Sequence, residues 1–301
     1  MSEVITRSEM VAAMEKQYGA TITESNRRDW SRMNMVVAKQ GDLEVRGERL
    51  DFHMFELSLG GRHNVNARSE FENGERHQGT FVPGSMNYMQ DTAQMYQTCE
   101  GEAHLQQIYI DSSIFTEVAQ AIAPGDPGNL RPLGFQGVFD TRLKRIALDI
   151  LQEARHPSAG GELYADALAQ QLAVLLLRRR LNGQKERDAF AGKLGPDELT
   201  KVIEFMSANL EEPGGLDTVA QIAGLDVFSF SRAFKAATGE APHQFLIKLR
   251  IIRAQELLAH SNDSIAEIAY SCGFASQSHM TATFRKHLGI TPRSFRREVT
   301  R

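Results

Sequence analysis

A short run of polar side chains near the C-terminus has the residue types and spacing suited to reading base edges in DNA. The run lies at or near the start of a predicted helix and consists of Gln277, Ser278, His279 and Thr281. Glutamine can pair bidentately with adenine, serine and threonine can pair with several bases, and the methyl group of threonine suits thymine. Arg285 and Lys286 follow further along this helix, where we expect contacts with phosphate, which set the register without specifying sequence.

The elements that must position these side chains occur twice in the sequence. One copy begins at Val219 and the other at Ile268, 49 residues later. The matched pairs are Ala220 and Ala269, Gly224 and Gly273 and, after one inserted residue, Phe234 and Phe284, Gly239 and Gly289, and Pro242 and Pro292. The alanines suit a close crossing of two helices, the first glycine suits a left-handed turn, and the phenylalanine anchors the second helix in a core. The second glycine ends that helix and the proline opens the next one, an order that predicts two helix-turn-helix units.

Helix-capping residues stand where such units require them. The sequence from Ser264 to Glu267 is a capping box, and Asp226 and Ser276 stand at the expected starts of the two second helices. An all-α domain without a nucleic-acid ligand is the alternative, but two copies are too few for a solenoid, which usually needs about three. That alternative also leaves the polar run at residues 277–279 without a purpose.

Residues from about 196 to 297 resemble the DNA-binding domain of the AraC/XylS family of bacterial regulators. The strongest match runs from Ile265–Ala269 through Cys272-Gly273-Phe274 and Ser276–His279 to Phe284-Arg285, Gly289 and Thr291-Pro292. The resemblance is long and specific in this second unit and looser in the first. It implies seven helices, with a rigid helix at Gln244–Leu258 between the two units. The apolar face of that segment indicates the same helix independently.

In the first unit, the resemblance implies that Phe228, Ser231 and Arg232 occupy the base-reading positions and that Lys235 contacts phosphate. Arg232 is the strongest single candidate because a guanidinium group matches O6 and N7 of guanine. Phe228 has two alternatives, contact with a thymine methyl group or packing within the domain. Since one chain carries two reading helices, we expect it to contact successive major-groove faces about 34 Å apart, so that each subunit reads an asymmetric site.

The charge distribution along the chain agrees with a nucleic-acid partner at one end only. The 301 residues have a formal net charge of −4. Residues 226–301 carry eleven Lys or Arg against six Asp or Glu, a balance of +5, so the remainder has a balance of −9. An acidic body joined to a basic tail is expected if only the tail meets a polyanion, although a basic surface without a partner has the same composition.

The composition also indicates the cellular compartment in which we expect the protein. No apolar run approaches the ~20 residues that a membrane span requires, and the first residues lack the pattern of a signal peptide. The two cysteines, Cys99 and Cys272, are too few for a disulfide framework and fit a reducing compartment. We therefore expect a cytoplasmic protein without membrane contact.

The N-terminal half is predicted to be a separate domain of short strands followed by helices. The predicted strands are Met35–Ala38, Leu50–Leu59, Thr80–Val82, Gln94–Cys99 and His104–Ile110, and the predicted helices are Asp140–Arg155 and Gly161–Leu181. Many short strands suggest a sandwich or barrel, and the AraC/XylS resemblance implies a small cupin-like β-barrel. We assign residues 1–181 to a regulatory, effector-sensing and dimerisation domain, the polar segment 182–195 to a linker and residues 196–301 to the DNA-binding domain. The predicted fold class is α+β with two domains.

We expect the front domain to bind a small effector and not to be an enzyme. Its histidines, among them His53, His63, His77 and His104, include no His-x-His pair of the kind that holds a metal in cupin enzymes, so we assign no metal, no cofactor and no catalytic residue. Phe52, His53 and Phe55 of one predicted strand are candidates for the effector pocket, with the inward face of that strand left open. The resemblance implies effectors such as sugars, aromatic acids or fatty acids and does not choose among them.

The resemblance further implies promoter DNA, RNA polymerase and a second copy of the chain as partners. The predicted helix Gly161–Leu181 has an apolar stripe that packs either against the barrel as core or against its twin in a dimer. The stripe consists of Tyr164, Leu168, Leu172, Leu175 and Leu176. Three functions remain: an effector-responsive transcription regulator, which the sequence favours, a DNA-binding protein whose front domain only dimerises, and a cupin-type enzyme fused to a DNA-binding module.

Overall fold

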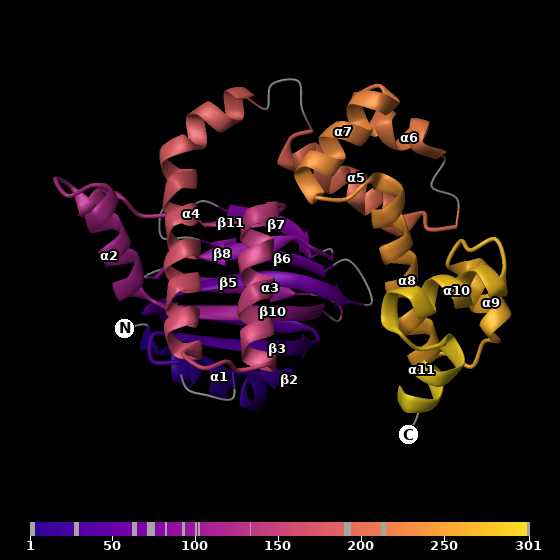
Figure 1. Cartoon of the computed structure of the whole chain (residues 1–301), viewed down its shortest axis with the longest axis horizontal. Coiled ribbons are helices and arrows are strands. Elements are labelled where there is room, and N and C mark those ends of the chain that lie inside the picture. The colour runs from indigo at the N-terminus through magenta and orange to yellow at the C-terminus, as the bar shows by residue number, and fades with distance from the viewer. Residues whose placement is uncertain are drawn as a thin grey trace. The chain divides into compact units, whose positions relative to one another are not determined.

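The chain folds into two compact units, residues 1–192 and 193–301, each described here by itself. The computed structural model (Figure 1) describes residues 4–26, 30–61, 65–70, 76–81, 83–91, 94–99, 101, 103–132, 134–189, 194–211 and 215–299. Of the sequence predictions, those for His63, Val82 and residues 190–193 lie outside the described residues. The side chains of His77 and Cys99 lie outside them as well.

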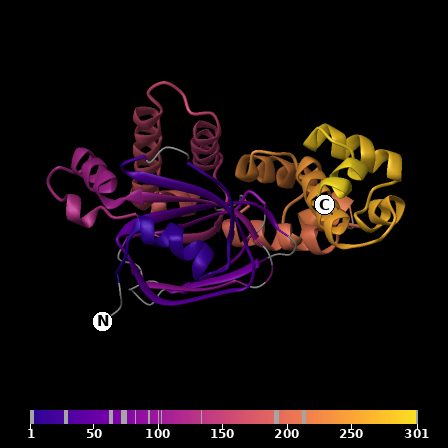
Figure 2. The same ribbon diagram turned by 90° about the horizontal axis from the view of Figure 1, so that it is seen from below.

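The first unit contains two β-sheets that face each other (Figure 2). The five-stranded sheet has the order β1 (Val4–Ile5), β4 (Leu43–Leu50), β9 (Gln94–Cys99), β6 (Val65–Glu70) and β7 (Arg76–Phe81). The six-stranded sheet has the order β11 (Phe135–Val138), β8 (Met86–Met89), β5 (Phe52–Gly61), β10 (Ala103–Asp111), β3 (Met33–Gln40) and β2 (Thr21–Ser25). Their pairings are antiparallel except for the parallel pair β1 and β4. This unit is the predicted cupin-like β-barrel.

Helices cover the six-stranded sheet on its outer face. These are α2 (Ser112–Ile122), α3 (Thr141–Arg155) and α4 (Gly161–Ala189), while α1 (Arg7–Lys16) lies on the barrel side and a 3-10 turn η1 (Pro127–Asn129) follows α2. Alternation along β3 divides the core: Met35 and Val37 pack with the outer helices, whereas Val36 and Ala38 pack with α1. Such period-2 alternation is what a sheet with both faces covered requires.

Helix α4 is longer than predicted, and the packing of its apolar stripe agrees with one of the two predicted alternatives. It continues to Ala189, so residues 182–189 are helical where the sequence predicts the start of an irregular linker. The boundary between the compact units still falls inside the predicted linker segment. The apolar stripe is mostly core, because Leu168, Leu172 and Leu176 are buried against the sheet and its covering helices. Among the described side chains of α4, the most exposed large apolar one is Leu163, at 77%.

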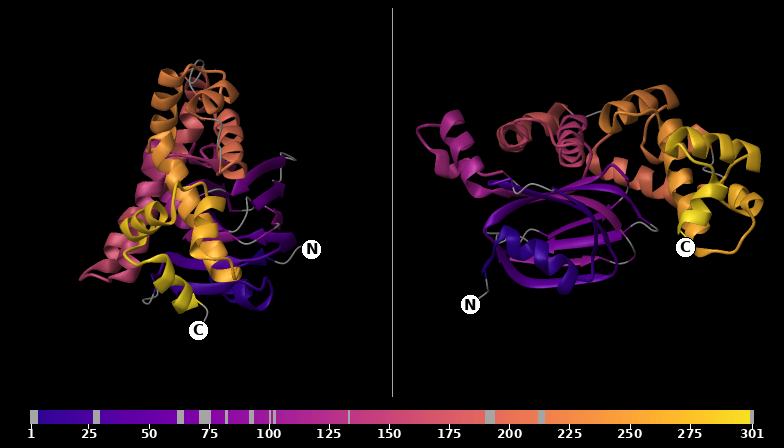
Figure 3. Two further views of the ribbon diagram at one scale, coloured as in Figure 1. Left: turned by 90° about the vertical axis from the view of Figure 1, so that its right-hand side faces the viewer. Right: turned by 60° about the horizontal axis from the view of Figure 1, so that its bottom comes forward.

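The second unit contains seven helices within its described residues, as the resemblance implies. They are α5 (Pro196–Ala208), α6 (Gly215–Ile222), α7 (Val227–Thr238), α8 (Pro242–His260), α9 (Ile265–Ser271), α10 (Gln277–Leu288) and α11 (Pro292–Val299). Figure 3 shows these short helices gathered around the longer α8. The predicted roles of the repeated residues are confirmed: Phe234 and Phe284 are fully buried, and Gly239 and Gly289 end their helices in the left-handed conformation.

Candidate functional site

The first helix-turn-helix unit is formed by α6, a glycine turn and α7. Gly224 adopts φ +65° in that turn, a conformation that costs glycine little. Asp226 then caps α7 as predicted, because its side chain accepts hydrogen bonds from the backbone N–H groups of Phe228 and Ser229 at 3.0 and 2.9 Å. The cap fixes where α7 begins and therefore which side chains its first turns present.

Helix α7 presents an aromatic and a basic side chain together. Phe228 is 70% exposed, so it is not packed within the domain, whereas Phe230 and Phe234 are buried. The guanidinium carbon of Arg232 lies 5.5 Å from the centre of the Phe228 ring, one helical turn away. Both side chains therefore lie on the face of α7 that is free to meet another molecule.

The other predicted contact residues of α7, Lys235 and Ser231, differ in exposure and in hydrogen bonding. Lys235 is exposed near the C-terminal end of the helix. Ser231 is half-buried, and its hydroxyl donates to the Val227 carbonyl at 2.8 Å. Because that proton is used within the helix, Ser231 offers a ligand chiefly an acceptor.

The second helix-turn-helix unit, formed by α9 and α10, has the predicted caps. The Ser264 hydroxyl accepts from the backbone N–H of Glu267, whose carboxylate accepts in return from the Ser264 N–H at 2.7 Å. Gly273 forms the left-handed turn with φ +75°, and the Ser276 side chain accepts from the backbone N–H of His279 at 3.1 Å. The polar run therefore stands at the start of α10.

The described side chains of α10 divide into a buried and an exposed face. Met280 and Phe284 are buried anchors, whereas the predicted contact residues are exposed apart from the half-buried Thr281. These residues are Gln277, Ser278, His279, Thr281, Arg285 and Lys286. A spacing of three and four residues places Ser278, Thr281 and Arg285 on one stripe of the helix. The His279 ring also packs edge-on against Phe274, with ring centres 5.5 Å apart, so it is partly held by the turn.

Arg250 of α8 connects the second helix-turn-helix unit to the segment at the end of α5. The sequence does not reveal this role. Nε and one terminal nitrogen of Arg250 donate to the Leu210 carbonyl at 3.0 and 2.8 Å. Gly273 lies directly beside this contact, since a Cβ placed there would be 2.1 Å from the Leu210 oxygen. Burial lowers the pKa of Arg250 from its usual range. The three residues therefore fix α10 relative to α8 and α5.

The three candidate effector residues of β5 do not share a face. Phe52 packs with α1 on the barrel side, and Phe55 packs in the core between the sheet and the outer helices. His53, on the same face as Phe55, lines a pocket of about 280 Å³. The pocket is bounded by α2, by the η1 segment and by Asp91 after β8. Of the three candidates, only His53 is among the residues that line it.

His53 is a buried imidazole held by three contacts. Its Nδ1 accepts from the Asp91 backbone N–H at 3.3 Å and lies 2.6 Å from the Tyr88 hydroxyl, and its Nε2 lies 3.4 Å from the Asp91 carboxylate. The ring also packs on Phe115, with centres 3.7 Å apart. Burial lowers the pKa of His53 to about 4, opposed by the Asp91 charge and reinforced by that of Arg131. The imidazole is therefore neutral at pH 7, with Nε2 directed to Asp91 as the protonated nitrogen.

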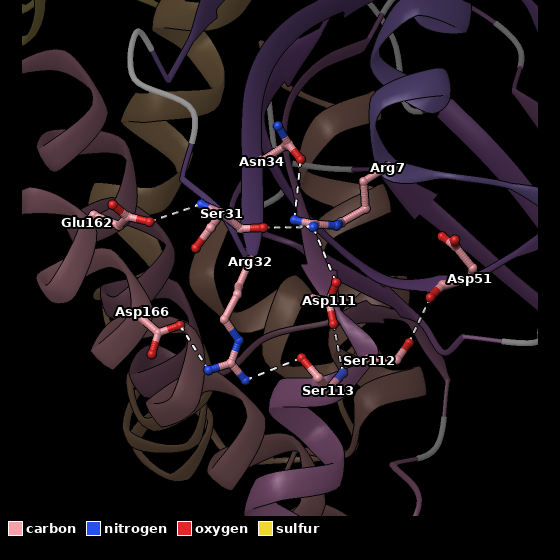
Figure 4. Close-up of polar contacts among 10 residues, drawn as sticks. All are labelled: Arg7, Ser31, Arg32, Asn34, Asp51, Asp111, Ser112, Ser113, Glu162 and Asp166. Carbon is pink, nitrogen blue, oxygen red and sulfur yellow. Dashed lines mark hydrogen bonds and ion pairs between the residues drawn. The ribbon is translucent and has the colours of Figure 1, made fainter.

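A chain of polar contacts connects α2 with α4 beside this pocket (Figure 4). The Arg32 guanidinium lies 2.8 Å from the Glu117 carboxylate on α2 and 3.5 Å from that of Asp166 on α4. Arg7 at the start of α1 donates to the Ser31 carbonyl and pairs with Asp111, the N-cap of α2. The hydrogen bond to Glu117 raises the pKa of Arg32 above its usual range. Arg32 thus bridges a carboxylate of α2 and a carboxylate of α4.

Among the described residues, no group of three or more His, Cys, Asp or Glu side chains could hold a metal ion. Likewise, no helix in the described ranges has the length and apolar character needed to cross a membrane. Cys272 is a buried free thiol, and burial raises its pKa to about 11.

Comparison with known proteins finds similar transcriptional regulators. A helix-turn-helix domain family matches residues 219–298. The HTH-type transcriptional regulator ArgR of Pseudomonas aeruginosa is 33% identical over 153 residues, which cover 50% of this chain and 46% of that protein. The HTH-type transcriptional activator RhaS of Escherichia fergusonii is 33% identical over 144 residues, 46% of this chain and 49% of that protein. The chain thus spans about half the length of the curated relatives it matches.

Solved structures of transcription factors also show similarity to part of this chain. A transcriptional regulator with an AraC-type DNA-binding domain from Chromobacterium violaceum is 36% identical, covering 35% of this chain and 94% of that one, with a TM-score of 0.34. The DNA-binding domain of AdpA in complex with a target DNA is also 36% identical, covering 33% of this chain and 90% of that one, with a TM-score of 0.32.

Proposed function

We propose that this chain, whose C-terminal part is an AraC-type helix-turn-helix domain, is a transcription regulator that binds promoter DNA through α7 and α10. The observation that carries the proposal is the pair of capped helices with exposed polar faces, each placed after a left-handed glycine turn. In a helix-turn-helix unit the second helix enters the major groove with its first turns at the base edges. The +5 balance of residues 226–301 supplies the attraction to phosphate.

We assign the base and phosphate contacts to residues of α7 and α10 according to the exposure of their side chains. Arg232 and Phe228 form the reading surface of α7, with Phe228 against a thymine methyl group and Arg232 against guanine. Gln277, Ser278 and Thr281 form that of α10, supported by His279. Lys235, Arg285 and Lys286 contact phosphate. Since the two reading helices belong to one chain, the site for each subunit is asymmetric.

The front unit is proposed to bind a small effector that alters DNA affinity or activation, and to form a homodimer; RNA polymerase is a further proposed partner. The supporting observation is the 280 Å³ pocket whose α2 wall is linked by Arg32 to α4. Two alternatives are a front unit that only dimerises and a cupin-type enzyme fused to the DNA-binding unit. Stoichiometric metal in the purified protein favours the enzyme. Thermal stabilisation by a small metabolite, about 2.7 kcal/mol at a concentration of 100 times its dissociation constant, favours the effector-responsive regulator.

The test of DNA binding is selection of duplexes from a random-sequence library by the full-length protein. We expect a recovered consensus with two unlike blocks about one helical turn apart, and an affinity that falls steeply with salt. A folded protein that recovers no consensus and shows no DNA affinity at low salt refutes the proposal.

A further inference from the structure

The pocket beside α2 carries charges of both signs around an apolar wall. Its polar side chains include Asp91 and Arg131, and its apolar ones include Phe115, Ala119 and Leu130. A volume of about 280 Å³ corresponds to roughly nine water molecules at about 30 Å³ each, which suits a small organic molecule. Few precisely placed polar groups on an apolar surface are the usual composition of a small-molecule site.

Arg131 is a cationic side chain among the described residues that line this pocket. It is exposed and, in the part of the chain that the structure describes, has no hydrogen bond or ion pair. The N-terminal turn of α2, which contributes Ser112 to the pocket wall, adds the partial positive charge of a helix start. The carboxylate of Asp111, which also acts on His53, is already paired with Arg7 at 3.2 Å. This side of the pocket therefore favours an anionic group.

The Asp91 carboxylate can accept a hydrogen bond from a ligand in the pocket. The carboxylate contacts Nε2 of His53 and is 23% exposed, so it is only partly shielded from the pocket that it lines. Because an ionised carboxylate only accepts hydrogen bonds, it calls for a donor on the ligand. The rings and methyl groups of Phe115, Ala119 and Leu130 supply an apolar surface for the rest of the molecule.

We propose that this pocket binds a small carboxylic acid with an apolar body and a hydrogen-bond donor next to the carboxylate, that is, an α-amino or α-hydroxy acid. Arg131 pairs with the carboxylate, Asp91 accepts from the ammonium or hydroxyl group, and the apolar body packs on Phe115. The role of this ligand as effector rests on the proposed function, whereas its binding does not.

We expect that binding of a ligand in the pocket affects α4. Phe115 and Thr116 line the pocket from α2, while Glu117 of the same helix pairs with Arg32. Arg32 in turn pairs with Asp166 on α4. A ligand that displaces α2 would thus act on α4 through the direct packing of the two helices and through Arg32, whose contacts with Ser113 and Asp166 are drawn in Figure 4.

The test is calorimetric titration of the full-length protein, without DNA, with four probes of one apolar body. The probes are L-phenylalanine, L-phenyllactate, 3-phenylpropionate, which lacks the donor, and 2-phenylethylamine, which lacks the carboxylate. We expect saturable binding of L-phenylalanine or L-phenyllactate, weaker binding of 3-phenylpropionate and none of the amine. The better of the first two identifies the donor as ammonium or hydroxyl.

Two variants locate the binding. Arg131→Gln should weaken the bound acid about tenfold or more, because a charge-assisted pair is lost. Arg145→Gln, which removes an exposed arginine of α3 outside the pocket, should leave the affinity unchanged. Failure of both acids to bind, equal binding of the amine, or an affinity indifferent to Arg131→Gln overturns the proposal. Since these titrations contain no DNA, a protein that binds the acid but selects no DNA sequence overturns only the proposed function.

Discussion

Replacement of Gly273 by alanine should loosen the second helix-turn-helix unit far more than the same change at its repeat partner Gly224. Both glycines adopt a left-handed conformation, with φ +75° and +65°. A Cβ at Gly273 would lie 2.1 Å from the Leu210 carbonyl oxygen and 2.8 and 2.9 Å from two nitrogens of Arg250. Among the described residues, apart from its two chain neighbours, no residue has an atom within 4 Å of a Cβ placed at Gly224. The two variants therefore share the backbone strain and differ in the steric clash.

The magnitudes follow from these contacts. A left-handed non-glycine residue costs about 1–2 kcal/mol, which applies to both variants. At Gly273 the Leu210 oxygen must also move away, and the hydrogen bonds that it accepts from Arg250 are then weakened or lost. A hydrogen bond to a charged group contributes about 1.5–3 kcal/mol. Since both bonds share one acceptor, we count this contribution once and expect Gly273→Ala to cost about 3–5 kcal/mol.

Cys272 provides a local assay beside the perturbed residue. The thiol is buried and free, so it reacts with an alkylating reagent only when the second unit opens. We expect Gly273→Ala to accelerate alkylation of Cys272 by about tenfold to hundredfold relative to Gly224→Ala, the factor that corresponds to about 1.5–3 kcal/mol. Peptide-resolved mass spectrometry at constant pH measures the rate. Equal rates in the two variants would show that the close approach of Gly273 to Leu210 and Arg250 does not hold this unit together.

Three further predictions concern the DNA contacts, the core and pH. Arg232→Ala should cost about 1–3 kcal/mol of DNA affinity and relax preference at one base pair, whereas Arg285→Ala should weaken all sequences alike and reduce the salt slope by about one unit. Leu168→Ala, in a side chain that is 5% exposed, should cost about 2–5 kcal/mol of folding stability, whereas the exposed Leu163→Ala should change it by less than about 0.5 kcal/mol. Because His53 has a pKa of about 4 in the folded chain and an ordinary value of 6.5, the unfolded chain binds its proton first. Folding stability from this group, about 3 kcal/mol, is therefore present above pH 6.5 and is lost as the pH falls towards 4.

Each of these predictions has a measurement that can contradict it. Binding to a library of singly substituted duplexes at two salt concentrations separates the two arginines, and an unchanged base profile in Arg232→Ala reduces that residue to a phosphate contact. Denaturant unfolding compares the two leucines, and similar losses would mean that Leu163 is covered in solution, as in a dimer. Unfolding of wild type and His53→Gln from pH 7.5 to 4.5 tests the last prediction, which fails if the two pH dependences are parallel.

Much of the DNA-binding unit could be predicted from the sequence because its signals are local. A cap and the N–H groups that it serves lie within three residues, as in Asp226 and Ser276, and a left-handed glycine ends a helix whatever lies around it. The repeat spacing added the expectation that these signals serve two copies of one unit. The same reasoning left Phe228 undecided, since burial of a helical side chain depends on what covers it. Its 70% exposure comes from the tertiary structure.

In the N-terminal unit, by contrast, most features of the candidate site depend on tertiary packing and not on local sequence signals. The five predicted strands correspond to β3, β5, β7, β9 and β10, whereas β1, β2, β4, β6, β8 and β11 were not predicted. The division of Phe52 from His53 and Phe55 depends on which elements cover each face of the sheet, and α1 and α2 were not anticipated either. The stripe of α4 was read correctly as apolar, yet only packing showed that Leu168 is core. Gly224 and Gly273 are the clearest case. They hold equivalent places in the repeat and have nearly the same φ, but Leu210 and Arg250 approach only Gly273. Local chemistry determines which conformations a residue adopts, whereas the neighbours that a folded chain brings from distant positions decide what that residue can touch.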